Sequence, residues 1–146
     1  MGAMRVVFVH GTGRSGALAW PGQATAVDLR RWDCRFPDLA PFDDPDDEVR
    51  VVLDALGVLE DGHGHLVAHS AGAVAALRAA ERTPDRVRSL VLLEPAAFSA
   101  ARGGPHVEEH VRQMGEVVAA AADPRVRDGD VAIRFLTALG APGAAI

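Results

Sequence analysis

The sequence lacks lysine, asparagine and tyrosine, and it contains a single cysteine and no long apolar run. With Cys34 alone, no intrachain disulfide can form, and we expect a reducing, cytoplasmic environment. No apolar stretch approaches the roughly 20 residues that a membrane-spanning helix needs. The N-terminus also lacks the charged segment and apolar run of a signal peptide. We therefore expect neither a disulfide framework nor a membrane partner.

The basic residues number fifteen, all of them arginine, and the acidic residues number twenty, which gives a formal net charge of −5. This balance offers no electrostatic basis for binding nucleic acid, so no nucleic-acid partner is expected. The absence of lysine also excludes a Walker-type phosphate loop, in which a lysine contacts the phosphates. The 146 residues, 49% of them hydrophobic, are enough for one compact domain and too few for two full ones.

Short apolar runs alternate with longer helical patterns in the first two thirds of the chain. We predict strands over 6–9, 32–36, 65–68 and 87–93, and helices over 17–30, 45–56 and 71–82. Pro21 is expected near the start of the regular part of the first helix. This alternation indicates an α/β fold with a parallel sheet and helices on both faces. After position 98 no strand follows, and two amphipathic helices are predicted over 107–118 and 131–139. We expect an N-terminal core, residues 1–98, and a helical cap-like segment, residues 99–146.

The helix over 45–56 has the clearest boundary signals. Asp44 is a favourable N-cap, Pro45 occupies the first helical position, and three acidic residues follow at the positive end of the helix dipole. The apolar residues behind them form one stripe, which predicts a buried face (Val49, Val52, Leu53 and Leu56).

The segment Ala68–Gly72 places Ser70 between a predicted strand and a predicted helix. Its pattern, small-x-Ser-x-small, is that of a nucleophile elbow, in which a sharp strand-to-helix turn exposes the serine hydroxyl. Small neighbours are needed because the turn brings the backbone close to adjoining elements. A second match surrounds Ser15, but that serine lies inside a glycine-rich loop and not directly after a strand. The alternative role for Ser70 is an ordinary helix N-cap.

Four segments in order resemble the N-terminal part of the α/β-hydrolase superfamily, over roughly residues 5–98 plus the start of a cap. They are the strand and His-Gly loop at 6–11, the Pro-Asp-Leu segment at 36–42, the elbow at 65–72 and the strand and its exit at 87–95. Ala68 replaces the usual first glycine of the elbow. The resemblance implies a serine hydrolase, esterase-like, acting on an ester, thioester, lactone or amide of a small molecule.

The resemblance also implies the remaining site residues. The oxyanion hole would be formed by the backbone N–H groups of Thr12 and Ala71. Glu94 is the only acid at the carboxyl end of a strand beside the elbow strand, and it is a candidate triad acid as well as a candidate solvated residue. No metal or cofactor is expected, because the histidines and acids lack ligand spacing.

No histidine matches the family position of the catalytic base, which follows the acid near the end of a longer chain. We expect His10 to shape its loop, and His69 to point away from its neighbour Ser70. The other histidines precede the third strand or lie in the C-terminal helical part (His63, His65, His106 and His110). The site is therefore predicted to be incomplete in this chain.

Two other functions remain open at this point. The glycines at 11, 13 and 16 match a dinucleotide-binding fingerprint, with Asp33 near the expected acidic position. Against this, Asp33 precedes Cys34 and Phe36 and does not close their strand. The missing histidine favours the other alternative, a non-catalytic relative that uses the fold for binding.

The strand over 87–93 is expected at one edge of a sheet ordered second, first, third, fourth. Its run Leu90–Leu93 contains no charge or proline to prevent pairing, whereas natural edge strands usually carry such protection. We therefore predict that this edge pairs with a copy of itself or with a complementing polypeptide.

Overall fold

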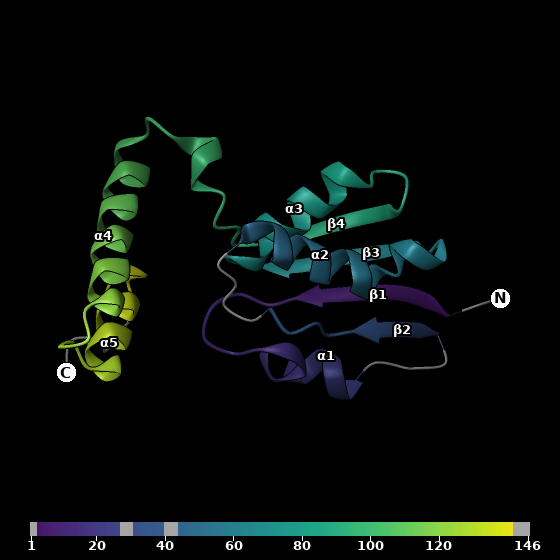
Figure 1. The fold of residues 1–146 in the computed structure, drawn as a ribbon, viewed down its shortest axis with the longest axis horizontal. Coiled ribbons are helices and arrows are strands. Elements are labelled where there is room, and N and C mark those ends of the chain that lie inside the picture. The colour runs from purple at the N-terminus through teal and green to yellow at the C-terminus, as the bar shows by residue number, and fades with distance from the viewer. Residues whose placement is uncertain (1–2, 27–30, 40–43, 142–146) are drawn as a thin grey trace. The chain divides into compact units, whose positions relative to one another are not determined.

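The computed structural model describes residues 3–26, 31–39 and 44–141, and the chain divides into two compact units, Met1–Ala97 and Phe98–Ile146. We call them the core unit and the helical unit. The core unit contains a parallel sheet of four strands in the order β2-β1-β3-β4 (Figure 1). The predicted α/β class and strand order are confirmed. The strands are β1 Met4–Val9, β2 Trp32–Arg35, β3 Gly64–His69 and β4 Val87–Leu93.

The helices of the core unit are α1 Pro21–Ala26, α2 Pro45–Leu56 and α3 Gly72–Arg82. The helix predicted over 17–30 opens with a short 3-10 turn at Gly16–Ala19, and its regular part, α1, begins at Pro21 as the sequence predicts. Proline lacks an N–H and fixes its own φ, so it is well suited to begin a new helix. Positions 27–30 lie outside the described residues.

Helix α2 begins as the sequence predicts. The side chain of Asp44 accepts a hydrogen bond of 2.9 Å from the Asp46 N–H, and Pro45 is the first helical residue. The helix ends at Gly57, which adopts the left-handed conformation with φ of 76°. These signals are local in sequence, which is why they locate both ends of the helix.

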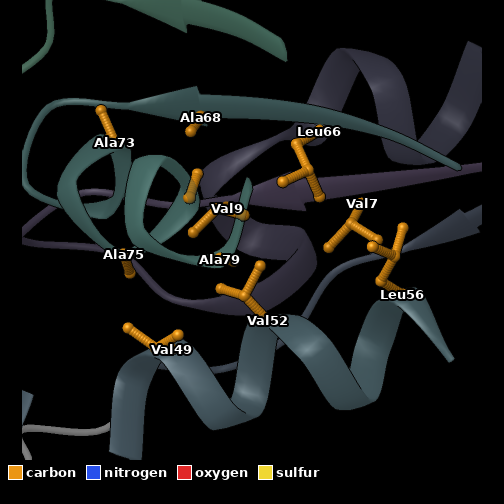
Figure 2. Close-up of a cluster of buried hydrophobic side chains, with 11 residues drawn as sticks. Val7, Val9, Val49, Val52, Leu56, Leu66, Ala68, Ala73, Ala75 and Ala79 are labelled. Carbon is orange, nitrogen blue, oxygen red and sulfur yellow. The ribbon is translucent and has the colours of Figure 1, made fainter. Parts of the chain in front are cut away.

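One face of the sheet is fully covered by α2 and α3. Val7, Leu66 and Val52 are completely buried there, and Leu90 and Leu92 of β4 pack against the same cluster. Figure 2 shows this cluster between the strands and the helices. Helix α3 presents mainly alanine to the sheet, so its backbone approaches closely (Ala73, Ala75, Ala76 and Ala79). We call this side the closed face.

The opposite side, which we call the open face, has less cover. Val6, Phe8 and Trp20 form a small buried cluster, in which the Phe8 ring lies 5.3 Å from that of Trp20. Towards β4 the side chains become exposed, and Val91 and Leu93 keep 45% and 42% of their accessible surface. The open face is therefore apolar but only partly buried within the described residues.

The helical unit contains α4 Pro105–Ala122 and α5 Asp128–Ala138, after a short 3-10 turn at Phe98–Ala101 that the sequence analysis did not anticipate. The two helices contact each other, and both predicted helices lie within them or extend one residue beyond. Gly140 follows α5 with φ of 69°. No helix in the described part of the chain is both long and apolar enough to cross a membrane.

Candidate active site

Ser70 occupies a strained turn between β3 and α3. Its φ is +51°, in the left-handed region that residues other than glycine seldom adopt. Ser15, the other candidate, has φ of −120° and ordinary extended backbone. A helix N-cap serine also has extended backbone, so the conformation of Ser70 is that of an elbow and not of a cap.

Backbone hydrogen bonds hold this turn from both sides. The Ser70 N–H donates to the carbonyl of Leu93 at 3.0 Å, and the Ser70 carbonyl accepts from Ala73 at 3.1 Å and from Ala96 at 3.0 Å. The nucleophile candidate is therefore fixed by the end of β4 as well as by its own helix. The contribution of Ala96 could not be expected from the sequence motif, because it comes from a turn 26 residues downstream.

The small residues of the site are required by close contacts. A Cβ atom at Gly72 would lie 2.1 Å from the carbonyl oxygen of His10, and a Cβ atom at Gly11 would lie 2.8 Å from the Cβ of Ser70. Both distances are shorter than van der Waals contact. The His-Gly loop and the elbow thus touch through glycine, which explains the residue types in both motifs.

His10 is buried, and both of its ring nitrogens are engaged. Nε2 accepts a hydrogen bond of 2.9 Å from the Leu39 N–H, so the ring proton is assigned to Nδ1, which donates to the carbonyl of Gly11 at 2.7 Å. Asp38 lies 3.5 Å from the same Nε2. His10 therefore joins the loop to the Pro-Asp-Leu segment, and no ring nitrogen is left to accept a proton from Ser70.

A cavity of about 350 Å³ opens beside the elbow, and Thr12 and Ala71 both line it. Among the described residues, neither of their N–H groups donates a backbone hydrogen bond, so both are available to a ligand oxygen. The half-buried Ser70 itself is not among the residues that line this cavity, although an elbow is expected to expose the serine hydroxyl.

A sequence profile of the alpha/beta hydrolase family matches residues 6–144, which is nearly the whole chain. The chain belongs to the alpha/beta hydrolase family. No curated protein gives a significant match to the sequence.

Solved structures similar to this alpha/beta hydrolase chain share its fold at low identity. An epoxide hydrolase from Bacillus megaterium has a TM-score of 0.63 and 17% identity, over 92% of this chain and 52% of its own. A putative ancestral haloalkane dehalogenase has a TM-score of 0.52 and 24% identity, over 97% and 59%. An epoxide hydrolase from Vigna radiata has a TM-score of 0.52 and 19% identity, over 90% and 61%. The hydrolase chain spans a little over half the length of these structures.

Glu94 lies at the end of β4 with a positive φ of +45°. Its side chain is 92% exposed, and its Oε2 lies 3.9 Å from Nε2 of His69, whose side chain is 46% exposed. This pair sits at the same end of the sheet as Ser70. The strained backbone of Glu94 is consistent with a functional position, since such strain is concentrated at active sites.

The other described histidines lie at the amino-terminal end of β3 or in the helical unit (His63, His65, His106 and His110). Nδ1 of His65 shares a hydrogen bond of 2.7 Å with the Ser89 hydroxyl, in the amino-terminal half of β3. The His110 ring packs 4.8 Å from that of Phe98. Within the described ranges, no histidine ring nitrogen is hydrogen-bonded to Ser70, so the structure does not identify a general base.

Asp33 does not occupy a ribose-binding position. It lies within β2, where Arg5 bonds it at 2.8 Å and Arg35 also contacts it. Burial raises the pKa of Asp33, but the hydrogen bonds from Arg5 and Arg35 outweigh this effect and lower it. This carboxylate is committed to an ion pair inside the sheet, which weakens the dinucleotide alternative. No cluster of three or more potential metal ligands occurs in the described segments.

Proposed function

We propose that this chain carries the nucleophile of a serine hydrolase that acts on an ester, thioester, lactone or amide of a small molecule. The observation that carries the proposal is the positive φ of Ser70 at the junction of β3 and α3, near two N–H groups that have no backbone partner among the described residues. Serine combined with an oxyanion hole is suited to acyl transfer.

In the proposed reaction, the Ser70 Oγ attacks the substrate carbonyl carbon and gives up its proton to a general base. The negative charge that develops on the carbonyl oxygen is stabilised by the N–H groups of Thr12 and Ala71. The bond to the leaving group then breaks, and the leaving group takes up the proton. Water subsequently attacks the acyl-serine by the same route, which releases the acid and restores Ser70.

Glu94 is the acid that we assign to this site. Its role would be to orient a histidine and stabilise the imidazolium ion, as the acid of a triad does. Its exposed side chain leaves room for a histidine to approach. That histidine is expected from outside the immediate surroundings of Ser70, because His10 is fully hydrogen-bonded and His69 faces Glu94.

The nucleophile is tested by labelling with a fluorophosphonate probe and by locating the adduct with mass spectrometry. We expect labelling at Ser70, abolished in Ser70→Ala and retained in Ser15→Ala, which is the matched control from the second motif. Labelling that persists in Ser70→Ala and moves to Ser15 would contradict the assignment. Variants His106→Ala and His110→Ala test whether a histidine of the helical unit serves as the base.

The reaction class is tested with p-nitrophenyl esters of short acids. We expect Ser70-dependent hydrolysis that is unaffected by EDTA, and loss of activity with the chelator would indicate different chemistry. Because the similar structures include epoxide hydrolases and a haloalkane dehalogenase, an epoxide and a haloalkane serve as comparison substrates. Turnover of these with no ester hydrolysis would contradict acyl transfer.

A non-catalytic binding protein is the second candidate, favoured by the absence of a histidine bonded to Ser70 among the described residues. It predicts no fluorophosphonate label and binding of acyl compounds that is unchanged in Ser70→Ala. A cytoplasmic location is proposed for either function, on the basis of the single cysteine.

A further inference from the structure

The cavity beside the elbow is lined by two side chains of opposite charge. Arg14 comes from the loop that follows β1, and Glu48 comes from the first turn of α2. The third titratable residue of the lining, His10, is neutral because its Nε2 accepts the hydrogen bond from Leu39. Thr12, whose N–H is a proposed oxyanion donor, lines the same cavity. A substrate bound at this donor therefore meets both charges.

Glu48 differs from the neighbouring acids at the start of α2. Asp46 pairs with Arg82 at 2.6 Å. Asp47 pairs with Arg50 on the next turn of the helix. Glu48 is half-buried, yet it makes no ion pair or side-chain hydrogen bond with any residue in the described ranges. A carboxylate that has lost part of its hydration without gaining a partner favours a cationic ligand.

Arg14 likewise has no ion pair or hydrogen bond from its side chain to the part of the chain that the structure describes. It lines the cavity together with Glu48, but the two side chains do not bond each other, so their charges remain available to a ligand. The guanidinium group offers five N–H donors in a planar arrangement that matches a carboxylate. Arg14 therefore favours an anionic group in the same cavity.

The size and the residue types of the cavity favour a small substrate. Its volume is about 350 Å³, near the lower end of the roughly 300–1,000 Å³ that ligand pockets occupy. Leu39 is the one large aliphatic side chain among the described residues of the lining, and four of the others are glycines. The cavity therefore offers little support for a long apolar acyl chain.

We propose that the substrate of this site is a small zwitterion, namely an ester, thioester or amide that also carries a free ammonium group and a free carboxylate group. Glu48 binds the ammonium group and Arg14 binds the carboxylate. A compound with only one of these groups gains one attraction and meets one repulsion, so it has little advantage over a neutral compound. This inference rests on the proposed function, because it takes the cavity beside Thr12 and Ala71 as the substrate site.

Binding to the Ser70→Ala chain tests the charge preference without turnover. Four amides with matched carbon chains serve as probes: butanamide is neutral, 4-aminobutanamide is cationic, glutaramic acid is anionic, and glutamine carries both charges. Exposed ion pairs are individually weak, so we expect glutamine to bind about threefold to tenfold more tightly than butanamide. The two singly charged amides should bind about as weakly as butanamide. Titrations followed by NMR measure all four dissociation constants.

Removing one charge at a time should reverse the order of the singly charged probes. In Glu48→Gln the anionic amide should bind more tightly than the cationic one, and in Arg14→Gln the cationic amide should bind more tightly. Glutamine should lose its advantage in both variants. The matched controls are Glu81→Gln and Arg78→Gln, which change exposed residues of α3 that do not line the cavity and should leave the order unchanged.

Equal binding of the four amides, or no saturable binding of any of them, would overturn the proposal. An equal loss for all four probes in Glu48→Gln and Arg14→Gln would also overturn it, because a change of fold and not of charge would then explain the result. Fluorophosphonate labelling of the parent chain separates this inference from the proposed function. Labelling at Ser70 without a charge preference overturns only the inference, whereas a charge preference without labelling contradicts only the nucleophile.

Discussion

The two faces of the sheet differ in how completely they are covered. On the closed face, Val7 and Leu66 are fully buried beneath α2 and α3, whereas on the open face Val67 is only half-buried and Val91 is largely exposed. Both faces are built from the same strands, and the sequence gives them similar apolar residues. The difference therefore arises from what is packed against each face and not from the strands themselves.

The closed face is already packed by elements of the core unit, whereas the open face is not fully covered by the described residues. The closed face is held by two helices, one with a capped start and one with a face of alanines. The elbow lies between β3 and α3 and depends on that packing. We therefore expect substitutions on the open face to cost less stability than substitutions on the closed face.

The largest difference in stability between the two faces is expected when neighbouring side chains of β3, which point to opposite faces, are shortened. Leu66→Ala should lower the free energy of unfolding by about 2–5 kcal/mol, because it leaves a cavity in a fully buried site. Val67→Ala, the matched control on the open face, should cost about 1 kcal/mol or less. Urea denaturation measures both, and equal losses would show that the faces do not differ.

The next largest loss of stability is expected from enlarging a buried side chain of α3. Ala79→Leu on α3 should cost about 1–3 kcal/mol, because its side chain has no exposed surface and no space to expand. Its matched control is Ala119→Leu on α4, which adds the same atoms at an exposed position. Thermal unfolding compares the two variants. A tolerated Ala79→Leu would mean that the closed face is looser than its burial indicates.

A smaller loss of stability is expected from removing the N-cap of α2. Asp44→Ala removes the hydrogen bond to Asp46 and should cost about 1 kcal/mol. Asp44→Asn retains an acceptor and should recover most of that loss, so it controls for a change at this position without loss of the cap. If both variants unfold at the same urea concentration as the parent chain, the cap does not stabilise the closed face.

The smallest effect is expected from the ion pair at the amino-terminal end of the closed face. Hydrogen bonds from Arg5 and Arg35 lower the pKa of Asp33 in the folded chain despite its burial. Its stabilisation is therefore present above the unfolded pKa, near 3.9, and is lost as the pH falls through the lower folded pKa. Asp33→Asn should cost at most about 1 kcal/mol at pH 7.

The pH dependence distinguishes charge from shape in that variant. Below the lowered folded pKa of Asp33 the parent chain also loses this charge, so the difference between the two proteins in urea denaturation should shrink as the pH falls. A difference that stays constant as the pH falls through that range would show that Asp33 acts through packing.

The sequence was sufficient for the sheet and for most helix boundaries because these depend on local patterns. The cap at Asp44 and the apolar run of β4 follow from such patterns, whereas the strand order was expected from right-handed crossovers together with the family resemblance. Pro21 marked the start of the regular first helix, but the 3-10 form of the turn before it was not expected, because that turn has no distinctive composition.

The candidate site was predictable only in part. The elbow motif identified the strained residue, Ser70, and the His-Gly motif identified the loop that contacts it. Three features of the site were not expected. Ser70 does not line the cavity, His69 contacts Glu94, and the Leu39 N–H bonds His10. They depend on distances between segments far apart in the chain, which a motif does not encode.

The hydrogen bonds around Ser70 also determine when the elbow can form during synthesis. Its N–H and C=O are bonded to Leu93 and Ala96, which leave the ribosome well after the serine itself. A nascent chain that ends at α3 would contain the whole elbow motif and its hydrogen bond from Ala73, and yet lack the two bonds to Leu93 and Ala96. A short peptide spanning β3 and α3 should likewise show no preference for positive φ at Ser70. The reactive conformation is therefore a late event in folding, acquired only when β4 has joined the sheet.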